Sequence, residues 1–458
     1  MIKQISIEKF FIYIALIFGC LYVFLLPPFQ SVDEASHFYR SYGIISNKLT
    51  AENIDGKIGD YLPKSLETVA SGYDYLIKNI DAKTDLKKIL NSKNIKLDPD
   101  KVKFIKFTNT ALYSPTCYLT QIPGMYIAKI LKTNPLIFLY AGRLSNLIFF
   151  SIIVFFAIKN IPFFKMPMML LALMPMTLSI NSALTSDTII IGLNFLWVSL
   201  ILKTLYEKKI SKLNIVLFML IAFLLSISKY YFLLIPLIFL LPKSLFKNWK
   251  QYILFIFGIA AMATAGILIW QHFTSDLLLS MNGNANANLQ LEFIKSYPLN
   301  YLAILLKTFI VKTPRIIITM IGVLGWQDTH LDFMTYIAYP ILIYMGLKLD
   351  KDKFKFTKWQ YSIILFDVIF SIISIYTCMY LMWSGVGSGI IYGLNGKYFI
   401  PLMIPIFLLF KNKLKYDMKQ EEITKLIICL ILILILISSD LSILHRFYNI
   451  TPNLYYKI

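Results

Sequence analysis

Cysteine and histidine are scarce in this sequence, with four residues of each among 458. Three of the cysteines, Cys20, Cys378 and Cys429, fall inside apolar runs, and only Cys117 lies in a polar stretch. This distribution provides neither a disulfide framework nor the paired spacing of a cysteine metal site. The sequence therefore argues against a disulfide-stapled fold, and we expect the cysteines to be small buried hydrophobes.

Signals for processing and duplication are also missing. The first apolar run follows Lys3 and Lys9, but no small-residue cleavage site comes after it, which favours an uncleaved helix over a signal peptide. The chain has no internal repeat, no inverted duplication and no low-complexity tail. We therefore treat residues 1–458 as a single domain.

Apolar residues, in contrast, are abundant: 57% of the chain is hydrophobic and the mean hydropathy is +0.66. Repeated apolar runs approach the length needed to cross ~30 Å of hydrocarbon, which predicts an all-α polytopic membrane protein. Eleven spans are predicted, near residues 10–27, 135–157, 166–183, 188–204, 213–228, 230–242, 252–271, 333–348, 360–382, 398–410 and 424–442. Two of these, 230–242 and 398–410, are short for a full crossing, so we expect them to be extended, tilted or broken.

The formal net charge of +20 would suggest nucleic acid as the partner of a soluble protein. Here the lysines cluster in short loops between apolar runs, and these loops all fall on one predicted side. They lie near residues 159–165, 203–212, 243–250, 351–358 and 411–419. By the positive-inside rule that side is cytoplasmic, with the N-terminus there and the C-terminus outside. The charge therefore indicates topology and contact with anionic lipid, not a nucleic-acid partner.

Two long elements are predicted on the outer side. Residues 28–134 form a loop whose middle, 48–106, holds twelve lysines and nine acids, too polar to enter lipid. We expect short helices there, including one that lies flat on the membrane. The second loop covers residues 272–332, and its apolar stretch 300–325 is interrupted by three cations and Pro314. This pattern predicts interfacial helices and not a crossing.

Candidate chemistry concentrates in PPFQSVDEASHFYR, residues 27–40, directly after the first span. The two prolines end the preceding helix, and Ser31 can cap a new one. In that helix Asp33, His37 and Arg40 are spaced i, i+4 and i+7 and so share one face. A base, a second titratable group and a fixed cation would then point together at the membrane surface.

A capping box is the alternative interpretation of this stretch. Ser31 and Glu34, three residues apart, can satisfy two helix-start amides, and Asp33 in the first turn suits the helix dipole. The capping box explains both acids. It leaves His37 and Arg40 unexplained.

Other polar residues of the outer side also allow two interpretations. Arg143, inside the second span, is costly there and would face a partner or a water-filled cavity, unless it snorkels to the interface. Lys229 is a lone cation at an outer turn and suggests an anionic partner. Asp187 either takes part in a site or caps the fourth span, as Asp commonly does. The proline-punctuated aromatic turn at 113–123 is either a loop anchor or part of the same site.

Two later outer segments complete the candidates. Asp328, His330 and Asp332 could ligate a divalent ion, but their alternate spacing matches no established metal motif. The glycine-rich loop at 384–396 leads to Lys397. Its backbone amides and this cation could hold an anion, or the segment could be a flexible loop without a ligand.

These motifs together resemble a known family. They are Asp33 to Arg40, Gly142-Arg143-Leu144, Ser186-Asp187, Ser228-Lys229, Gly325-Trp326 and Asn395 to Pro401. Their order is similar to that of the bacterial membrane family of domain of unknown function 2142. That family resembles in layout the GT-C glycosyltransferases, including protein O-mannosyltransferases and aminoarabinose transferases, which carry an acidic motif in the first outer loop. The family pattern usually has arginine and glutamine where this chain has Lys397 and Asn395, and lysine lacks the bidentate fork of arginine.

The resemblance implies a GT-C-like membrane enzyme of the bacterial cytoplasmic membrane. It would transfer a sugar from a polyprenyl-phosphate carrier to an extracytoplasmic cell-envelope acceptor, with inversion at the anomeric carbon. Asp33 would act as general base, with Glu34 as its partner or as ligand of an occasional divalent cation. The residues expected on the phosphate side of the donor are His37, Arg40, Arg143, Lys229, Lys397 and Tyr398. We expect no fixed metal site and no nucleic acid.

Two rival functions stay open from sequence. A transporter or flippase of lipid-linked sugars would place its charges at mid-membrane between repeated bundles, and only Arg143 is well placed for that. A non-catalytic envelope assembly protein would use its outer loops to bind partners. The enzyme hypothesis further predicts that Asp33 lies near Arg143, Lys229 and Lys397 in a cavity that opens to the outer leaflet.

Overall fold

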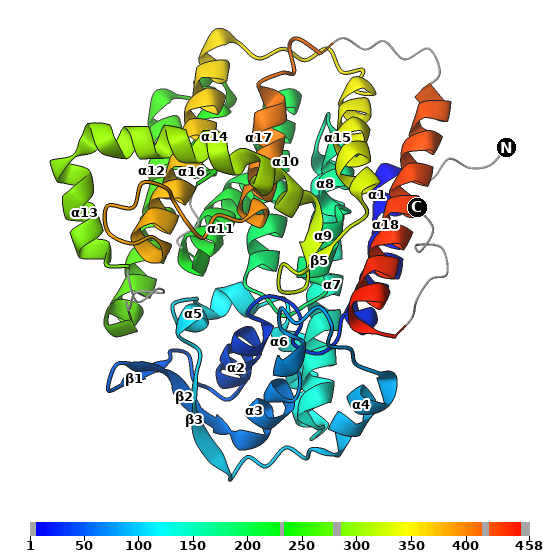
Figure 1. Cartoon of the computed structure of the whole chain (residues 1–458). Coiled ribbons are helices and arrows are strands. Elements are labelled where there is room, and N and C mark those ends of the chain that lie inside the picture. The colour runs from blue at the N-terminus through cyan, green and yellow to red at the C-terminus, as the bar shows by residue number, and fades with distance from the viewer. Residues whose placement is uncertain (1–5, 230–232, 278–284, 415–420, 450–458) are drawn as a thin grey trace.

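The computed structural model describes residues 6–229, 233–277, 285–414 and 421–449. The chain is mostly helical (Figure 1). Within the described ranges, six helices are long and apolar enough to cross a membrane. They are α1 (Ile7–Leu25), α7 (Pro135–Asn160), α10 (Asp187–Glu207), α12 (Trp249–Thr274), α16 (Lys358–Trp383) and α18 (Glu421–Phe447). These helices and the composition support a polytopic membrane protein.

Two further predicted spans form shorter helices. They are α11 (Lys212–Lys229) and α15 (Phe333–Lys348), and the second has the bounds that the sequence predicts. The span predicted at 166–183 is instead two short helices, α8 (Lys165–Ala172) and α9 (Pro175–Asn181). The break occurs where Met174 is extended before Pro175, because proline disfavours the helical conformation in the residue before it.

The two short predicted spans are irregular as well. Residues 398–410 correspond to the 3₁₀ segment η7 (Gly396–Leu402) and the short helix α17 (Met403–Leu408). Of 230–242, residues 230–232 lie outside the described part, and the remainder contains the 3₁₀ segment η4 (Ile235–Leu240). Prolines at 236, 401 and 405 remove backbone donors in these stretches. The count of eleven spans is therefore not confirmed.

The stretch predicted to form interfacial helices is one continuous helix, α14 (Pro298–Gly322), which follows α13 (Ala287–Ser296). Figure 1 shows α14 running across the direction of α10 and α16. It packs on η7 through Gly396, where an added Cβ would stand 2.1 Å from Met320 N and 2.3 Å from Ile316 O. Only glycine allows the two backbones to approach this closely. This contact fixes the position of η7.

Residues 28–134 form a compact outer unit at one end of the helices (Figure 1). Its helices are α2 (Glu34–Ile45), α3 (Lys64–Ser71), α4 (Leu86–Asn91), α5 (Thr108–Ala111) and α6 (Ile122–Ile130). They accompany an antiparallel sheet in the order β1 (Glu52–Ile54), β2 (Lys57–Pro63), β3 (Val102–Lys106). The short helices were predicted, whereas the sheet corrects the all-α prediction. The sheet arises where β2 buries Ile58 and Leu62 on one face while Tyr61 stays exposed.

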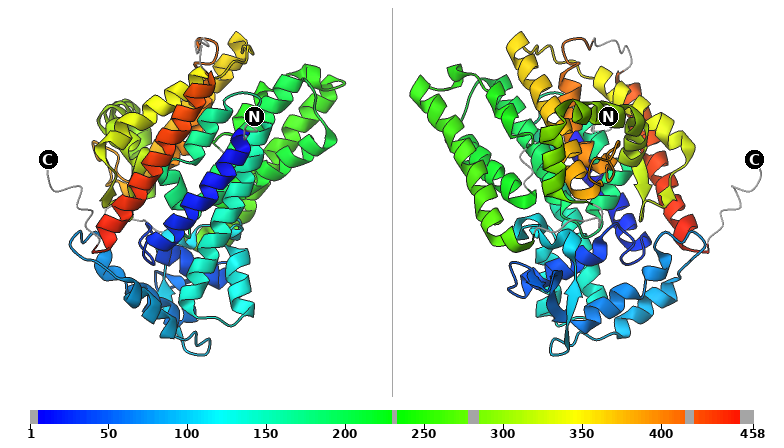
Figure 2. Two further views of the ribbon diagram at one scale, coloured as in Figure 1. Left: turned by 90° about the vertical axis from the view of Figure 1, so that its right-hand side faces the viewer. Right: turned by 60° about the vertical axis from the view of Figure 1, so that its left-hand side comes forward.

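The lysine-rich connections lie at the other end of the helices, away from the outer unit (Figures 1 and 2). The helix α1 begins at that end, and α18 runs from it toward the outer unit. The described parts of the lysine-rich loops therefore share one end of the helices, as the sequence predicts. Between the two ends α10 is buried over nearly its whole length, so its first residue, Asp187, lies inside the protein.

Candidate functional site

The first helix of the outer unit begins differently from the prediction. Asp33 and not Ser31 is the N-cap residue of α2, and its φ of 62° lies in the left-handed region. The Asp33 side chain makes no capping hydrogen bond. Such strain in a non-glycine residue persists only where the surrounding structure enforces it, and it is frequent at functional sites. The carboxylate of Asp33 is thereby directed away from the helix it caps.

The capping box is also absent. The backbone N–H of Glu34 donates to the carbonyl of Ser31 at 3.1 Å, which is a turn and not a side-chain cap. The Glu34 carboxylate instead lies against Arg143. The capping-box interpretation of Ser31 and Glu34 is therefore wrong, whereas Asp33 stands at the N-cap position without a side-chain capping bond.

Asp33 and His37 line a cavity of about 370 Å³ between the outer unit and the membrane helices. Polar, aromatic and apolar residues line the cavity, and we refer to the apolar ones together as its apolar wall. The polar residues are Asp33, His37, Asn109, Ser186, Asp187, Ser374 and Lys397, and aromatic rings come from Tyr113, Trp383 and Tyr398. The apolar residues are Ile190, Ile191, Leu233, Ile375, Met379 and Pro401.

An ion pair crosses the cavity between Lys397 and Asp187. The Lys397 Nζ lies 2.8 Å from the Asp187 carboxylate, and the two side chains are 19% and 11% exposed. Asp187 is the first residue of α10, and Lys397 belongs to η7, which is held by the bond from Gly396 N–H to Thr319 Oγ1. The backbone N–H of Lys397 donates to the Asn395 side chain. The sequence favoured a helix cap for Asp187, whereas its carboxylate belongs to the site.

The imidazole of His37 is held by two tyrosines. Its ring stacks on Tyr113 with centroids 6.0 Å apart, and Nδ1 lies 3.1 Å from the Tyr118 hydroxyl. Both tyrosines come from the aromatic turn at 113–123. This turn therefore contributes to the site and does more than anchor a loop.

Arg40 shares a helix with Asp33 but does not line the cavity. Its guanidinium is 1% exposed and donates to the carbonyls of Lys48, Leu49 and Tyr113. These contacts hold the segment after α2 and the backbone of the tyrosine that stacks on His37. Arg40 therefore does not reach the cavity in which the donor phosphate is predicted to bind, and its Nη1 and Nη2 groups donate to carbonyls elsewhere.

Arg143 and Glu34 form a fully buried ion pair. The Nε–Oε1 distance is 2.7 Å and the Nη2–Oε2 distance is 2.5 Å, and neither side chain is exposed. Arg143 also donates to the carbonyls of Val23, Leu26 and Pro27. Neither residue is among the described cavity-lining residues. The sequence predicts Arg143 near Asp33 in one cavity, on the phosphate side of the donor. Arg143 instead pairs with Glu34, the neighbour of Asp33, and does not line the cavity.

Of the remaining predicted residues, some line the cavity and one has a side chain outside the described residues. Tyr398 lines the cavity, and the Lys397 Nζ stands 5.6 Å from its ring centroid. Lys229 is the last residue of α11, and its side chain lies outside the described residues. The structure thus brings Asp33, His37, Lys397 and Tyr398 together.

The acidic segment before α15 does not form a metal site. Asp328 pairs with Arg446 at 2.6 Å, and the Asp332 side chain accepts from Met334 N–H as the cap of α15. His330 is exposed in β5 (Thr329–His330), which pairs with β4 (Val323–Leu324). Among the described residues, no three His, Cys, Asp or Glu side chains are grouped to hold a metal.

Sequence reasoning missed the wall contributed by α16. Cys378 was expected to be buried, but it is exposed and lines the cavity with Ser374 and Trp383. Ser374 and Cys378 are four residues apart on one helix face, which was a weak signal in an apolar span. Asn109 carried no recognisable pattern.

The chemistry available in the cavity follows from the residues that line it. Asp33 is a carboxylate acceptor that the helix start does not use, and Lys397 supplies a cation beside Asp187. The apolar wall can accommodate a hydrocarbon chain. A carboxylate, a cation and apolar side chains thus share one cavity.

Comparison with known proteins identifies one matching family. The model of the family described as "Predicted membrane protein (DUF2142)" matches residues 16–406. No curated protein and no solved structure matches the chain.

Proposed function

The chain belongs to the predicted membrane protein family DUF2142, and we propose that it is a glycosyltransferase of GT-C type. In this proposal it moves a sugar from a polyprenyl-phosphate carrier to a cell-envelope acceptor outside the cytoplasmic membrane, with inversion. One observation carries the proposal. Asp33, whose backbone is in the left-handed region and whose side chain makes no capping bond, lines the same cavity as Lys397 and the apolar wall. The lysine-rich end would face the cytoplasm and the outer unit the opposite side.

The cavity residues suggest how the transfer proceeds. Asp33 takes the proton of the acceptor hydroxyl, whose oxygen attacks the anomeric carbon of the donor. The bond from that carbon to the phosphate oxygen breaks, and its electron pair leaves with polyprenyl phosphate. Lys397 stabilises the negative charge on the departing phosphate, and the proton on Asp33 is later released to water.

The apolar wall suits the isoprenoid of the donor. Residues from α10, from the turn before η4 and from α16, such as Ile191, Leu233 and Met379, line the side of the cavity formed by membrane helices. A lipid carrier would lie along this wall with its phosphate near Lys397. The acceptor would enter from the outer unit, where His37 and Asn109 line the other side.

A direct assay tests the proposal. The full-length protein is reconstituted in proteoliposomes with a radiolabelled polyprenyl-phosphate sugar and an extract of cell-envelope acceptor. We expect free polyprenyl phosphate to appear in step with labelled acceptor. Asp33→Asn should abolish both, whereas Asp81→Asn, an exposed acid of the same outer unit, should not. Equal transfer by Asp33→Asn and wild type would refute the proposed base.

The same assay separates the two rival functions. A flippase would move labelled lipid across the bilayer with its sugar still attached, so no polyprenyl phosphate would form. An assembly protein would leave the donor unchanged and on its original side. Deletion of the gene, followed by analysis of the sugar composition of the envelope, would then narrow the identity of the sugar and the acceptor.

A further inference from the structure

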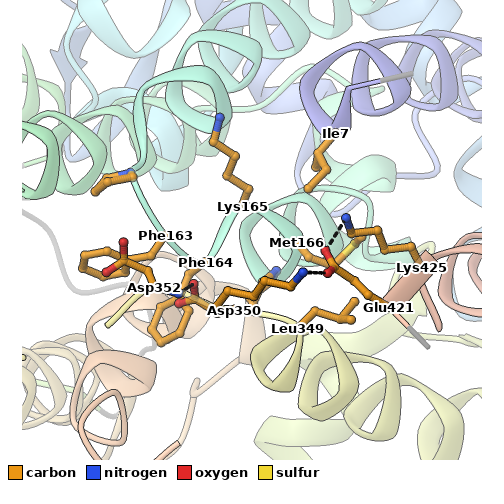
Figure 3. Close-up of a pocket in the computed structure, with 14 residues that line it drawn as sticks. Ile7, Phe163, Phe164, Lys165, Met166, Leu349, Asp350, Asp352, Glu421 and Lys425 are labelled. Carbon is orange, nitrogen blue, oxygen red and sulfur yellow. Dashed lines mark hydrogen bonds and ion pairs between the residues drawn. The ribbon is translucent and has the colours of Figure 1, made fainter. Parts of the chain in front are cut away.

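A second cavity, of about 420 Å³, lies at the lysine-rich end of the helices. Its walls come from the starts of α1, α8 and α18 and from the segment after α15 (Figure 3). The volume is typical of a small-ligand pocket. Since the first cavity adjoins the outer unit, the two cavities serve opposite ends of the protein.

An acid in this cavity is held between two cations. The Glu421 carboxylate pairs with Lys351 and, at 2.6 Å, with Lys425 (Figure 3). The Lys351 side chain is 59% exposed and is therefore able to move. Lys165 lines the same cavity, and its ammonium contacts the backbone carbonyl of Lys159 at 3.4 Å, which is a neutral acceptor. Lys351 and Lys425 thus flank the position that the Glu421 carboxylate now holds, and Lys165 lines the same cavity with its ammonium turned away from Glu421 (Figure 3).

The other two acids of the cavity have polar partners of their own. Lys411, only 5% exposed, places its Nζ 3.0 Å from the Asp350 carboxylate and 2.6 Å from the Asp352 carbonyl. Burial raises the pKa of Asp350, although the Lys411 ammonium opposes this. The Asp352 carboxylate accepts from the backbone N–H of Phe354 at 2.7 Å. With Asp350 paired to Lys411, the three lysines of the lining face two carboxylates, those of Glu421 and Asp352.

The rest of the lining is apolar and partly strained. Ile7, Met166 and Leu349 contribute hydrocarbon beside the charged groups (Figure 3). Phe164, at the start of α8, has a φ of 64° in the left-handed region. Such strain is frequent where a ligand is clamped. The cavity thus offers cations to a head group and an apolar surface to a chain.

We propose that this cavity binds a phosphate group, which takes the place of the Glu421 carboxylate between Lys351 and Lys425, while any hydrocarbon chain attached to the phosphate lies on the apolar part of the lining. Basic pockets between membrane helices on the lysine-rich side recognise anionic head groups through the same chemistry. The phosphate can come from a membrane phospholipid or from a soluble phosphate compound. This inference is independent of the proposed transfer reaction.

Native mass spectrometry of the full-length protein in detergent tests the site. The probes are phosphatidylglycerol, diacylglycerol with the same acyl chains, and inorganic phosphate. We expect phosphatidylglycerol to bind and diacylglycerol to bind much less, because only the first carries phosphate. Lys351→Ala and Lys425→Ala should each weaken phosphatidylglycerol binding by about fivefold. Glu421→Gln should strengthen it, because it removes the competing carboxylate.

Lys209→Ala is the matched control, since Lys209 is an exposed lysine of the same end outside the cavity. Binding of inorganic phosphate as tight as that of phosphatidylglycerol would support the site and assign its ligand to the soluble source. Equal loss in Lys209→Ala and the cavity variants would overturn the proposal. So would weaker binding by Glu421→Gln, provided that its unfolding midpoint without lipid matches that of wild type.

Discussion

The Glu34 carboxylate and the Arg143 guanidinium meet at two points, 2.7 Å and 2.5 Å apart, with neither side chain exposed. The pair joins the start of α2 to the middle of α7. Through carbonyls of residues 23–27 it also holds the end of α1, and Leu184 N–H donates to Glu34 at 3.0 Å. These bonds position the strained turn at Asp33, although neither residue reaches the cavity.

We expect Arg143→Met to destabilise the protein by about 3–5 kcal/mol, because it leaves the Glu34 carboxylate buried without its partner. Glu34→Gln should be similarly harmful, although glutamine would have preserved a capping box. The loss should appear as reduced yield and a lower unfolding midpoint in detergent. The double variant Glu34→Gln/Arg143→Met should be more stable than the sum of the two effects predicts, since no unpaired charge is left. Additive effects would contradict this assignment.

How much of this could be read from sequence depends on the range of the interactions. The apolar helices and the place of Asp33 in the candidate site can be predicted from local composition and spacing, which a single sequence contains. The partner of Glu34 does not, because 109 residues separate it from Arg143. An arginine in a span signals a polar partner, but the sequence does not distinguish a substrate phosphate from a buried carboxylate.

The broken helices show a second limit. Apolar runs at 166–183 and 398–410 satisfied the hydropathy criterion, but their prolines interrupt the backbone bonding that a span requires. For Asp187 the sequence favours helix capping, because its neighbours Thr185 and Ser186 are typical of a helix start. Only the three-dimensional structure shows Lys397, 210 positions away, beside its carboxylate.

Asp33→Asn should remove turnover while the protein stays folded. The Asp33 side chain makes no capping bond, so the substitution costs α2 nothing at that point. Loss of a general base typically lowers kcat by ~10²–10⁴-fold. Transfer is measured in proteoliposomes, with size-exclusion profiles as the check on folding. Wild-type turnover in a monodisperse variant would show that Asp33 is not the base.

Lys397→Met should lower kcat by about 10²–10³-fold, as expected when one charged donor to a developing anion is lost. Lys397→Arg should retain more activity, since it keeps the cation. Asp187→Asn should act through Lys397, so adding it to Lys397→Met should have little further effect. A full additional loss in the double variant would mean that Asp187 has a role of its own. The comparison of single and double variants uses the same transfer assay.

Asp60 gives the outer unit a defined pH response. Burial raises the pKa of this carboxyl, while its ion pair with Lys48 opposes the shift. A raised pKa means that the folded state binds the proton more tightly. The stabilisation that proton binding to Asp60 gives the folded state is therefore fully present below the unfolded pKa of about 3.9. It is lost as the pH rises through the pKa of Asp60 in the folded state.

Asp60→Asn removes this titration. The unfolding midpoint of Asp60→Asn minus that of wild type should therefore be larger at pH 7 than at acidic pH, where the Asp60 carboxyl of wild type binds its proton. The measurement is thermal unfolding in detergent across this range, with Asp81→Asn, an exposed acid, as control. A difference that grows as the pH falls would reverse the assigned direction.

Cys378 provides a probe of the apolar wall. It is exposed and lines the cavity, whereas Cys117 is fully buried and Cys20 and Cys429 are half-buried in α1 and α18. A maleimide should therefore modify Cys378 first. Mass spectrometry of the digested protein identifies the site, and Cys378→Ser should remove the fast phase of labelling.

Polyprenyl phosphate should protect Cys378, because a chain lying along the wall of α16 would cover the sulfur while its phosphate sits at Lys397. Protection should weaken in Lys397→Met, since the phosphate loses its cation, but labelling without lipid should be unchanged. A polyprenol of the same length, without phosphate, is the matched control and should protect only at higher concentration. If polyprenyl phosphate and polyprenol protect equally, the chain binds without help from Lys397, and the proposed orientation of the donor in this cavity is wrong.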